Sequence, residues 1–304
     1  MNDRPHVRQV NWPEQIAVAA AYAAVWEVAR HFSFSHWSLV SGIRLACLLL
    51  VPRRYWYAMA LGETLPVMTN GLMYIPQFGW WYGLVGSIPV IFPCLPVMAW
   101  LRRRASVFLA DGSVNMLLFG TAALACALIS ALFNEVAVAG AIWPTEPGHA
   151  PPYASLAQGF LTYLLGAYLG SLTLAPSLVA LRLAAQRKDI RNLWQGALSR
   201  ELGVVVALLG MAVFASGHLQ GASLMLCRIS VALPVVAIAI RHGWQGAALS
   251  ATLASIALAM TSATVRDPAM IQAQAIFAAA LSATLLVTSR RAATAADVVT
   301  GHAR

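Results

Sequence analysis

Residues 36–56 read HWSLVSGIRLACLLLVPRRYW, a stretch with the apolar density of a membrane helix that nevertheless carries Arg44 near its middle. A cation at the centre of a membrane helix costs about 2.5–3.5 kcal/mol on insertion scales, and such residues usually face a bundle interior or a water-filled cavity. The stretch therefore predicts a helix packed among other helices, in which Arg44 has a partner.

The composition of the chain is that of an integral membrane protein. Apolar residues make up 60% of it and charged residues only 10%, whereas soluble domains contain about 25% charged residues. The net charge of +9 comes from short basic clusters between apolar segments, not from one basic face. This placement is typical of membrane topology and argues against nucleic-acid binding.

Apolar runs long enough to cross a ~30 Å hydrocarbon core recur along the chain. We expect an all-α, polytopic transmembrane bundle of about ten spans (8–10). The predicted spans lie near residues 14–32, 37–52, 55–73, 81–101, 113–140, 156–182, 201–217, 222–240, 243–263 and 269–289. Three prolines, at 89, 93 and 96, predict a kink or break in the fourth span.

The basic residues predict the orientation of the bundle. With an even number of spans both termini lie on one side, and most of the 20 Lys and Arg residues fall on that side. The positive-inside rule then places both termini in the cytoplasm. We expect a cytoplasmic N-terminal segment (1–13), one membrane bundle (14–290) and a disordered cytoplasmic tail (291–304) without a catalytic or signalling domain.

Glu63 is the expected partner of Arg44. If 37–52 and 55–73 form an antiparallel hairpin, residues whose numbers sum to about 107 lie at the same depth, about 14 Å from the turn at 1.5 Å per residue. Arg44 and Glu63 meet this condition, and a carboxylate can bind a guanidinium through two parallel hydrogen bonds. We therefore predict an intramembrane ion pair.

Further polar side chains fall in the predicted outer half of the spans, namely Asn70, Asn134, Glu135 and Arg228. Because intramembrane ionisable groups mark functional sites by default, we expect an outward-facing pocket lined by Arg44, Glu63, Glu135 and Arg228, with Asn70 and Asn134 nearby. Two other readings stay open. The charges could be structural ion pairs that fix helix register, or a proton relay in a secondary transporter.

Other site types have little support in the sequence. The four cysteines lie inside apolar segments without a CxxC motif and read as small buried hydrophobes. No nucleophile elbow, zinc-protease or nucleotide-binding motif occurs in a fitting context, and the histidines lack ligand spacing. We expect no catalytic residues, no metal and no cofactor. Gly166 and Gly170 form a GxxxG motif, which permits close helix packing within the protein or in a dimer.

Three stretches resemble the MASE1 family of bacterial membrane sensors. WSLVSGIRLACLLLVPRRYW (37–56) has a Trp and a Gly before a run of small and leucine residues that ends at a basic turn. LLGAYLGSLTLAPSLVAL (164–181) is similar to the family's Gly-rich helix with an Ala-Pro step, and SLMLCRISVALPVVAIAIRHGWQGAALSATLA (223–254) to its late helix pair. The prolines that commonly follow the Trp are replaced here by Ser-Leu-Val at 38–40.

The resemblance implies a sensory module of the bacterial inner membrane, usually fused to a histidine kinase, diguanylate cyclase or phosphodiesterase, that reads an extracytoplasmic or membrane-borne cue. With no output domain expected, we predict relay through 102–112 and 182–200 to a separate histidine kinase or cyclic-di-GMP enzyme. The unidentified small ligand would meet Arg44 and Arg228 as anion or dipole receptors, with Glu63 and Glu135 as counter-charges. The alternative is a secondary transporter that uses these residues.

Overall fold

The computed structural model describes residues 11–33, 36–109, 113–141, 156–186, 196–262 and 267–301, with side chains up to residue 290. The described part is helical and contains no β-strand, only isolated bridge residues. Its helices are α1 (Trp12–His31), α2 (Leu39–Leu50), the 3-10 turn η1 (Arg53–Tyr55), α3 (Trp56–Met73), α4 (Ile75–Gly86), α5 (Ile91–Arg104), α6 (Met116–Ala139), α7 (Leu156–Gln186), α9 (Ala197–Ser216), α10 (Gly221–Ser230), α11 (Ala232–Met260) and α12 (Pro268–Gly301).

Two glycines reverse the direction of the chain inside the segments named α4 and α11. Gly79 has φ 84° and Gly243 has φ 65°, values that only glycine adopts readily. Beyond Gly243 the chain runs back beside α10, as the hydrogen bond from Arg228 Nη2 to the Thr261 carbonyl at 2.8 Å shows. In a straight helix these residues would lie about 50 Å apart at 1.5 Å per residue. Gly243 therefore joins two antiparallel helical arms. After Gly79 the rest of α4 runs back along α3, so that Ser87 Oγ lies 3.5 Å from the Met68 carbonyl oxygen.

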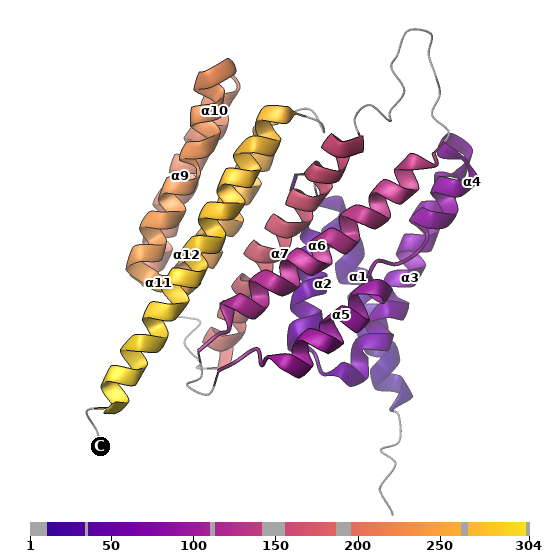
Figure 1. Cartoon of the computed structure of the whole chain (residues 1–304), viewed down its shortest axis with the longest axis horizontal. Coiled ribbons are helices and arrows are strands. Elements are labelled where there is room, and N and C mark those ends of the chain that lie inside the picture. Colours follow the sequence, from indigo (N-terminus) through magenta and orange to yellow (C-terminus); the bar gives the residue numbers. More distant parts are fainter. Residues whose placement is uncertain are drawn as a thin grey trace, which may run out of the picture.

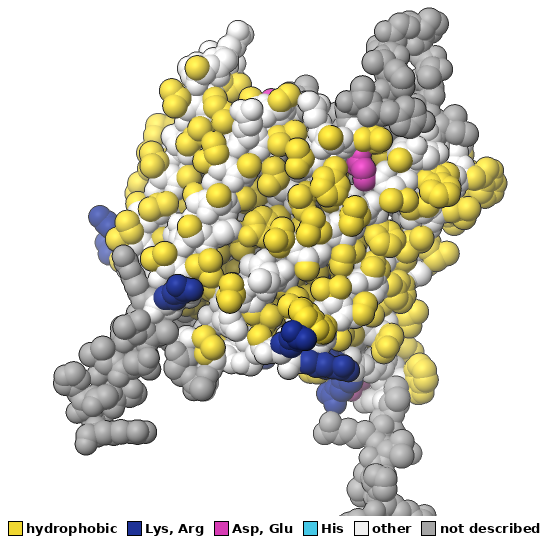
Figure 2. Space-filling view, viewed as in Figure 1, with side chains coloured by type: hydrophobic (Ala, Val, Ile, Leu, Met, Phe, Trp, Pro, Cys, Tyr) yellow, Lys and Arg dark blue, Asp and Glu magenta, His cyan; other side chains and the backbone are white. Residues whose placement is uncertain are grey.

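Six helical stretches are long and apolar enough to cross a membrane: Ile75–Arg104, Met116–Ala139, Leu156–Gln186, Ala197–Ser216, Gly221–Met260 and Pro268–Arg290. Large apolar side chains cover the outer surface, as Figure 2 shows for one face, and Leu65, Phe214 and Ile240 are each at least 70% exposed. An apolar surface of this extent matches a lipid environment, so the chain is an all-helical, multi-pass membrane protein.

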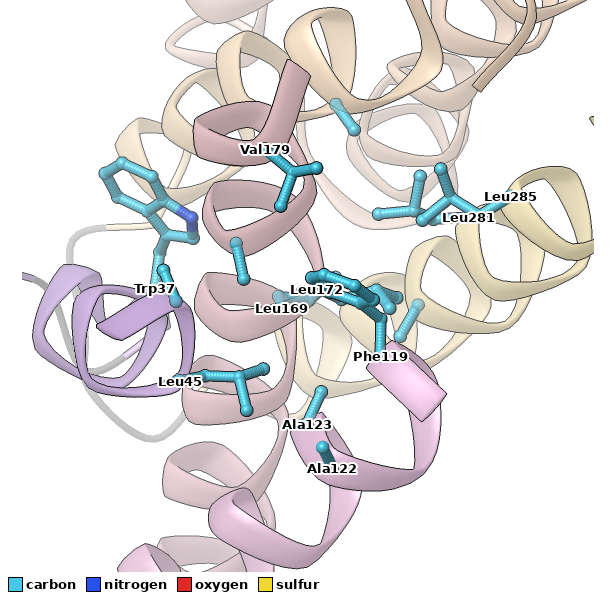
Figure 3. Close-up of a cluster of buried hydrophobic side chains, with 14 of the residues drawn as sticks. Trp37, Leu45, Phe119, Ala122, Ala123, Leu169, Leu172, Val179, Leu281 and Leu285 are labelled. Atoms are coloured by element: carbon cyan, nitrogen blue, oxygen red, sulfur yellow. The ribbon is translucent and has the colours of Figure 1, made fainter. Parts of the chain in front are cut away.

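α7 lies at the centre of the bundle (Figure 1), with α2 and α6 on one side and α11 and α12 on the other. Buried side chains from these helices meet around it, including Leu45, Phe119, Leu169, Leu172 and Leu281 (Figure 3). Glycines allow α2 to approach α7 closely, because a Cβ at Gly42 would clash with the Gly170 carbonyl oxygen. The GxxxG motif thus serves packing within the chain.

The short helix α2 begins with a cap instead of a proline. Ser38 Oγ accepts a hydrogen bond from the Ser41 amide at 3.3 Å, and the Ser38 amide donates to the Gly166 carbonyl on α7 at 3.1 Å. A serine at this position satisfies an otherwise unpaired amide of the first turn. The departure from the family's prolines therefore gives α2 a defined start anchored to α7.

The structure agrees with one predicted detail of the spans and differs in another. The break predicted in the fourth span lies at 87–90, around Pro89, and the helix resumes as α5. At the other end, α12 runs to Gly301, whereas the residues after 290 were expected to be disordered. Their alanine-rich sequence has high helix propensity, and extending an existing helix requires no new nucleus.

Candidate functional site

Arg44 on α2 and Glu63 on α3 form a buried, bidentate ion pair. Arg44 Nε lies 3.1 Å from Glu63 Oε2, and Nη2 lies 2.8 Å from Oε1. Glu63 is fully buried and Arg44 is 5% exposed. The ion pair that was predicted from the matching depths of the two residues is thus present in the structure. Its two parallel hydrogen bonds are the geometry that makes Arg–carboxylate contacts strong.

Glu63 accepts further hydrogen bonds from two other helices. The Tyr22 hydroxyl on α1 donates to Oε2 at 3.1 Å, and the Ile91 amide donates to Oε1 at 3.2 Å. Ile91 is the first residue of α5, where backbone amides lack helical acceptors and the helix dipole favours a negative charge. Glu63 is therefore held by donors from α1, α2 and α5, which is how a protein stabilises a buried carboxylate.

Arg44 also lines a cavity of about 720 Å³. Its walls come from α1, α2, α3, α4, α6 and α7, and they include Ser41, Tyr74, Phe78, Tyr82, Ser130, Asn134 and Tyr163. Arg44 Nη1 donates to Ser130 Oγ at 3.4 Å. Small-molecule sites typically enclose about 300–1,000 Å³ and combine apolar walls with a few placed polar groups, so this cavity has the size and character of a ligand site.

A second ion pair lies at the edge of the cavity. Arg30 lines it and pairs with Glu27 on the same helix, with Nη2 2.6 Å from Oε1. Arg30 Nη1 also donates to Asn70 Oδ1 on α3 at 3.3 Å. Both partners are substantially exposed, with side-chain exposures of 38% and 42%. This pair therefore links α1 to α3 without being sealed in the interior.

The cavity brings together only some of the predicted site residues. Arg44, Asn70 and Asn134 line it, and Glu63 lies directly behind Arg44. Glu135, expected in the same pocket, instead lies on the α7 side of α6, where its carboxylate oxygens are 3.4 Å from the position of a Cβ at Gly159. Consecutive helical residues point about 100° apart, so Asn134 and Glu135 face different neighbours.

Arg228 belongs to a different part of the molecule, which corrects its predicted place in the pocket. Its Nη1 lies 2.8 Å from Asp267 Oδ2, and its side chain is 2% exposed. Asp267 Oδ1 also accepts the amides of Ala269 and Met270, at 3.0 and 3.2 Å, and so caps α12. The hairpin at Gly243 places α10 beyond α12 and away from α2 and α3 (Figure 1).

The environment of Asp267 favours its charged form. Burial acts to raise the pKa of this carboxyl, but hydrogen bonds from Arg228 and the Met270 amide, with the positive charge of Arg228, hold the pKa below its ordinary value. Arg228 and Asp267 thus connect α10 to the start of α12 as a structural ion pair.

A model of the MASE1 family matches residues 15–295, nearly the whole chain. The chain belongs to the MASE1 family. MASE1 is a family of membrane-associated sensory domains. No curated protein and no solved structure matches the chain. The MASE1 match includes α1 to α7, so the ion pair and the cavity both lie inside the sensory domain.

Sequence reasoning missed the aromatic side of the MASE1 cavity and the donors around Glu63. Tyr22 has no distinguishing pattern, and the Ile91 amide is invisible in a sequence. Ser130 was also missed but carried a usable signal, because it lies four residues before the predicted Asn134, and residues four apart share a helix face. Tyr74 and Tyr82 reach the cavity because of the reversal at Gly79.

Two arginines from other helices donate hydrogen bonds to the carbonyls at the C-terminal end of α2. Arg102 Nη1 on α5 donates to the carbonyls of Leu48 and Val51, each at 3.0 Å. Arg182 Nη1 on α7 donates to the Leu50 carbonyl at 3.4 Å. The last carbonyls of a helix lack internal donors, so these contacts tie α2 to two other helices. The predicted relay loops continue from here, but 110–112 and 187–195 lie outside the described residues.

Proposed function

We propose that this MASE1 protein is a sensor of the bacterial inner membrane that binds a small extracytoplasmic or membrane-borne cue and relays it to a separate signalling protein. The observation that carries the proposal is the buried Arg44 guanidinium, which is fixed by Glu63 on one side and lines a cavity of about 720 Å³ on the other. The family's sensory character supports the same role.

The proposed topology has about ten passes, the number that apolar segment lengths predict. Supporting it, the reversal at Gly243 divides the long apolar stretch Gly221–Met260 into two antiparallel arms. Basic side chains gather at the lower end of the bundle in Figure 2. By the positive-inside rule this end is cytoplasmic. The cavity lies toward the opposite ends of α2 and α3, so it faces the outside of the cell.

The surroundings of the ion pair favour sensing over a purely structural role. If the two charges only fixed the register of the helices, we would expect packed side chains to enclose them. Empty space beside a buried ion pair loses van der Waals contacts and gives nothing in return. Arg44 instead borders the cavity, and Asn134 borders it from α6.

The same contacts argue against the transport alternative. A proton relay needs a carboxylate that exchanges its proton and its partners during the cycle. Glu63 accepts hydrogen bonds from Arg44, Tyr22 and the Ile91 amide and is fully buried. Because these contacts fix a fully buried carboxylate, Glu63 is better suited to hold Arg44 in place.

The relay to the partner runs through α2 in this proposal. The helix carries Arg44 in its middle, and its far end is tied to α5 by Arg102 and to α7 by Arg182. A cue that displaces Arg44 shifts a helix of only 12 residues, and the arginines transmit the shift to the cytoplasmic ends of α5 and α7. The receiving partner is a histidine kinase or a cyclic-di-GMP enzyme.

Quantitative co-purification from native membranes in mild detergent tests this role. We expect a histidine kinase or cyclic-di-GMP enzyme in stoichiometric amounts, and none with an unrelated membrane protein of similar size. The absence of any signalling partner would contradict the proposed relay, and proton-gradient-dependent uptake of a solute into liposomes would then support transport.

A further inference from the structure

One wall of the cavity consists of hydrogen-bond donors on α2 and α6. A guanidinium has five N–H groups, and Arg44 uses three of them, on Glu63 twice and on Ser130 once. Two therefore remain for another acceptor. One turn along α6 from Ser130, Asn134 also lines the cavity, and its Nδ2 is buried without a hydrogen-bond partner among the described residues. A buried donor without an acceptor is destabilising, so this wall favours a ligand that supplies acceptor oxygens.

Three aromatic rings give another part of the cavity an apolar character. Tyr74 lies between α3 and α4, and Phe78 and Tyr82 lie on α4. The ring centroids of Phe78 lie 5.8 Å from Tyr74 and 5.0 Å from Tyr82, and the latter two are 6.2 Å apart in an edge-to-face arrangement. The sharp turn at Gly79 brings Tyr82 back beside Phe78. All three rings line the cavity. Rings at these separations attract one another and offer faces and edges to a further planar ring.

The charges of the cavity are balanced within its own walls. Glu63 neutralises Arg44, and because it is fully buried and held by donors from three helices it does not give way to an incoming anion. At the edge, Glu27 neutralises Arg30. An anionic ligand would bring an uncompensated charge out of water, and a cationic ligand would face Arg44. Of the two roles expected for Arg44, anion receptor and dipole receptor, this balance favours the dipole receptor.

We propose that the cavity binds an uncharged, planar aromatic molecule that carries an acceptor oxygen. Its ring packs against Tyr74, Phe78 and Tyr82, and its oxygen accepts hydrogen bonds from Arg44 and Asn134. The volume of about 720 Å³ accommodates a molecule with two fused rings. This inference rests on the proposed sensory function, since it names the chemistry of the cue that the cavity reads.

A series of similarly shaped probes tests the ligand class on the full chain in lipid nanodiscs, with empty nanodiscs correcting for partition into lipid. The probes are 1-acetylnaphthalene (aromatic, uncharged, acceptor), 1-naphthoate (aromatic, anionic), 1-ethylnaphthalene (aromatic, no acceptor) and 1-acetyldecalin (saturated, acceptor). We expect 1-acetylnaphthalene to bind at least ten-fold more tightly than each of the others. Equal or tighter binding of 1-naphthoate or 1-acetyldecalin, or no protein-dependent binding of any probe, overturns the proposal.

Two variants locate the binding in the cavity. Ala137→Phe fills the space from α6 and should weaken 1-acetylnaphthalene at least ten-fold, whereas Leu124→Phe, on an exposed position of the same helix, should leave binding unchanged. Asn134→Leu removes an amide without filling the site. It should weaken 1-acetylnaphthalene about ten-fold and leave 1-ethylnaphthalene unaffected. Unchanged binding in Asn134→Leu and in Ala137→Phe contradicts the proposal.

The two proposals fail in different experiments. Binding is measured on the purified protein without any partner, so a wrong probe order overturns the ligand class and leaves the sensory relay standing. If the probe order holds but no signalling partner co-purifies, the relay fails and the ligand class stands.

Discussion

Arg44 and Glu63 share two hydrogen bonds, of 3.1 and 2.8 Å, but only Arg44 borders the cavity. Glu63 is enclosed on all sides and also binds Tyr22 and the Ile91 amide. The carboxylate therefore positions the guanidinium, and the guanidinium presents its remaining donors to the cavity. This asymmetry is the basis of the sensory account, because a ligand at Arg44 acts directly on α2.

The ion pair should show strong mutational coupling. Removing one partner leaves the other as an unpaired buried charge, so Arg44→Met and Glu63→Met should each lower the free energy of unfolding by about 3–5 kcal/mol. The double substitution removes both charges and should lose less than either single one. Denaturant unfolding in detergent measures the cycle. Additive losses would show that the two side chains do not depend on each other.

The close contact of α2 with α7 predicts a contrast between two glycines. A Cβ at Gly170 would clash with the Ser38 backbone, so Gly170→Ala should lower the unfolding free energy by about 1–3 kcal/mol. A Cβ at Gly120, on α6, meets nothing within 4 Å, and Gly120→Ala should be neutral or stabilising by up to about 1 kcal/mol. Thermal unfolding of both variants checks the contrast, which equal effects would refute.

The pair of Arg228 and Asp267 predicts a pH-dependent contribution to stability. Because the folded pKa of Asp267 lies below its unfolded value of about 3.9, the contribution is complete above about pH 4 and is lost as pH falls through the folded pKa. Asp267→Asn keeps a capping side chain but removes the charge, and should cost about 3 kcal/mol at pH 7.

Unfolding of the wild type and Asp267→Asn across pH 7 to 2 measures this contribution. The stability difference between the two proteins should shrink toward the acid end. A difference that stays constant over the whole range would exclude the ion pair as its source.

Arg102 should couple the cavity to the cytoplasmic end without taking part in ligand binding. Arg102→Gln removes the contacts to the Leu48 and Val51 carbonyls, so it should reduce the partner's response to a cue several-fold while probe affinity stays within two-fold. Arg103→Gln, at an exposed neighbouring position, is the matched control. Activity of the co-purified enzyme and probe binding are the two readouts. Equal effects of the two variants on the response would argue against the relay through α2.

The helical class and the main ion pair follow from the sequence for physical reasons, whereas the family follows from the three stretches that resemble it. Apolar segments follow the thickness of the bilayer, and the basic turn at Arg53 and Arg54 allows the depths of Arg44 and Glu63 to be matched from their residue numbers alone. The GxxxG motif correctly suggests close packing, although not that its partner is α2.

The residues that line the cavity could not be predicted from residue numbers and polarity, because they depend on how each helix is rotated about its own axis. Asn134 and Glu135 are adjacent in sequence, yet only Asn134 faces the cavity. Arg228 has the burial expected of a site residue, but the reversal at Gly243 pairs it with Asp267 instead. Where no short turn fixes the register of two neighbouring helices, polarity and approximate depth predict that a residue needs a partner, but not which partner it finds.

Labelling from one side of the membrane measures whether the cavity opens to the outside of the cell. In spheroplasts, a membrane-impermeant maleimide should label Asn70→Cys at the cavity wall without permeabilisation, above the background of the wild type with its native cysteines. Arg103→Cys, at the proposed cytoplasmic end, should be labelled only after permeabilisation. Labelling of Asn70→Cys only after permeabilisation, or not at all, would contradict an outward-facing sensory cavity.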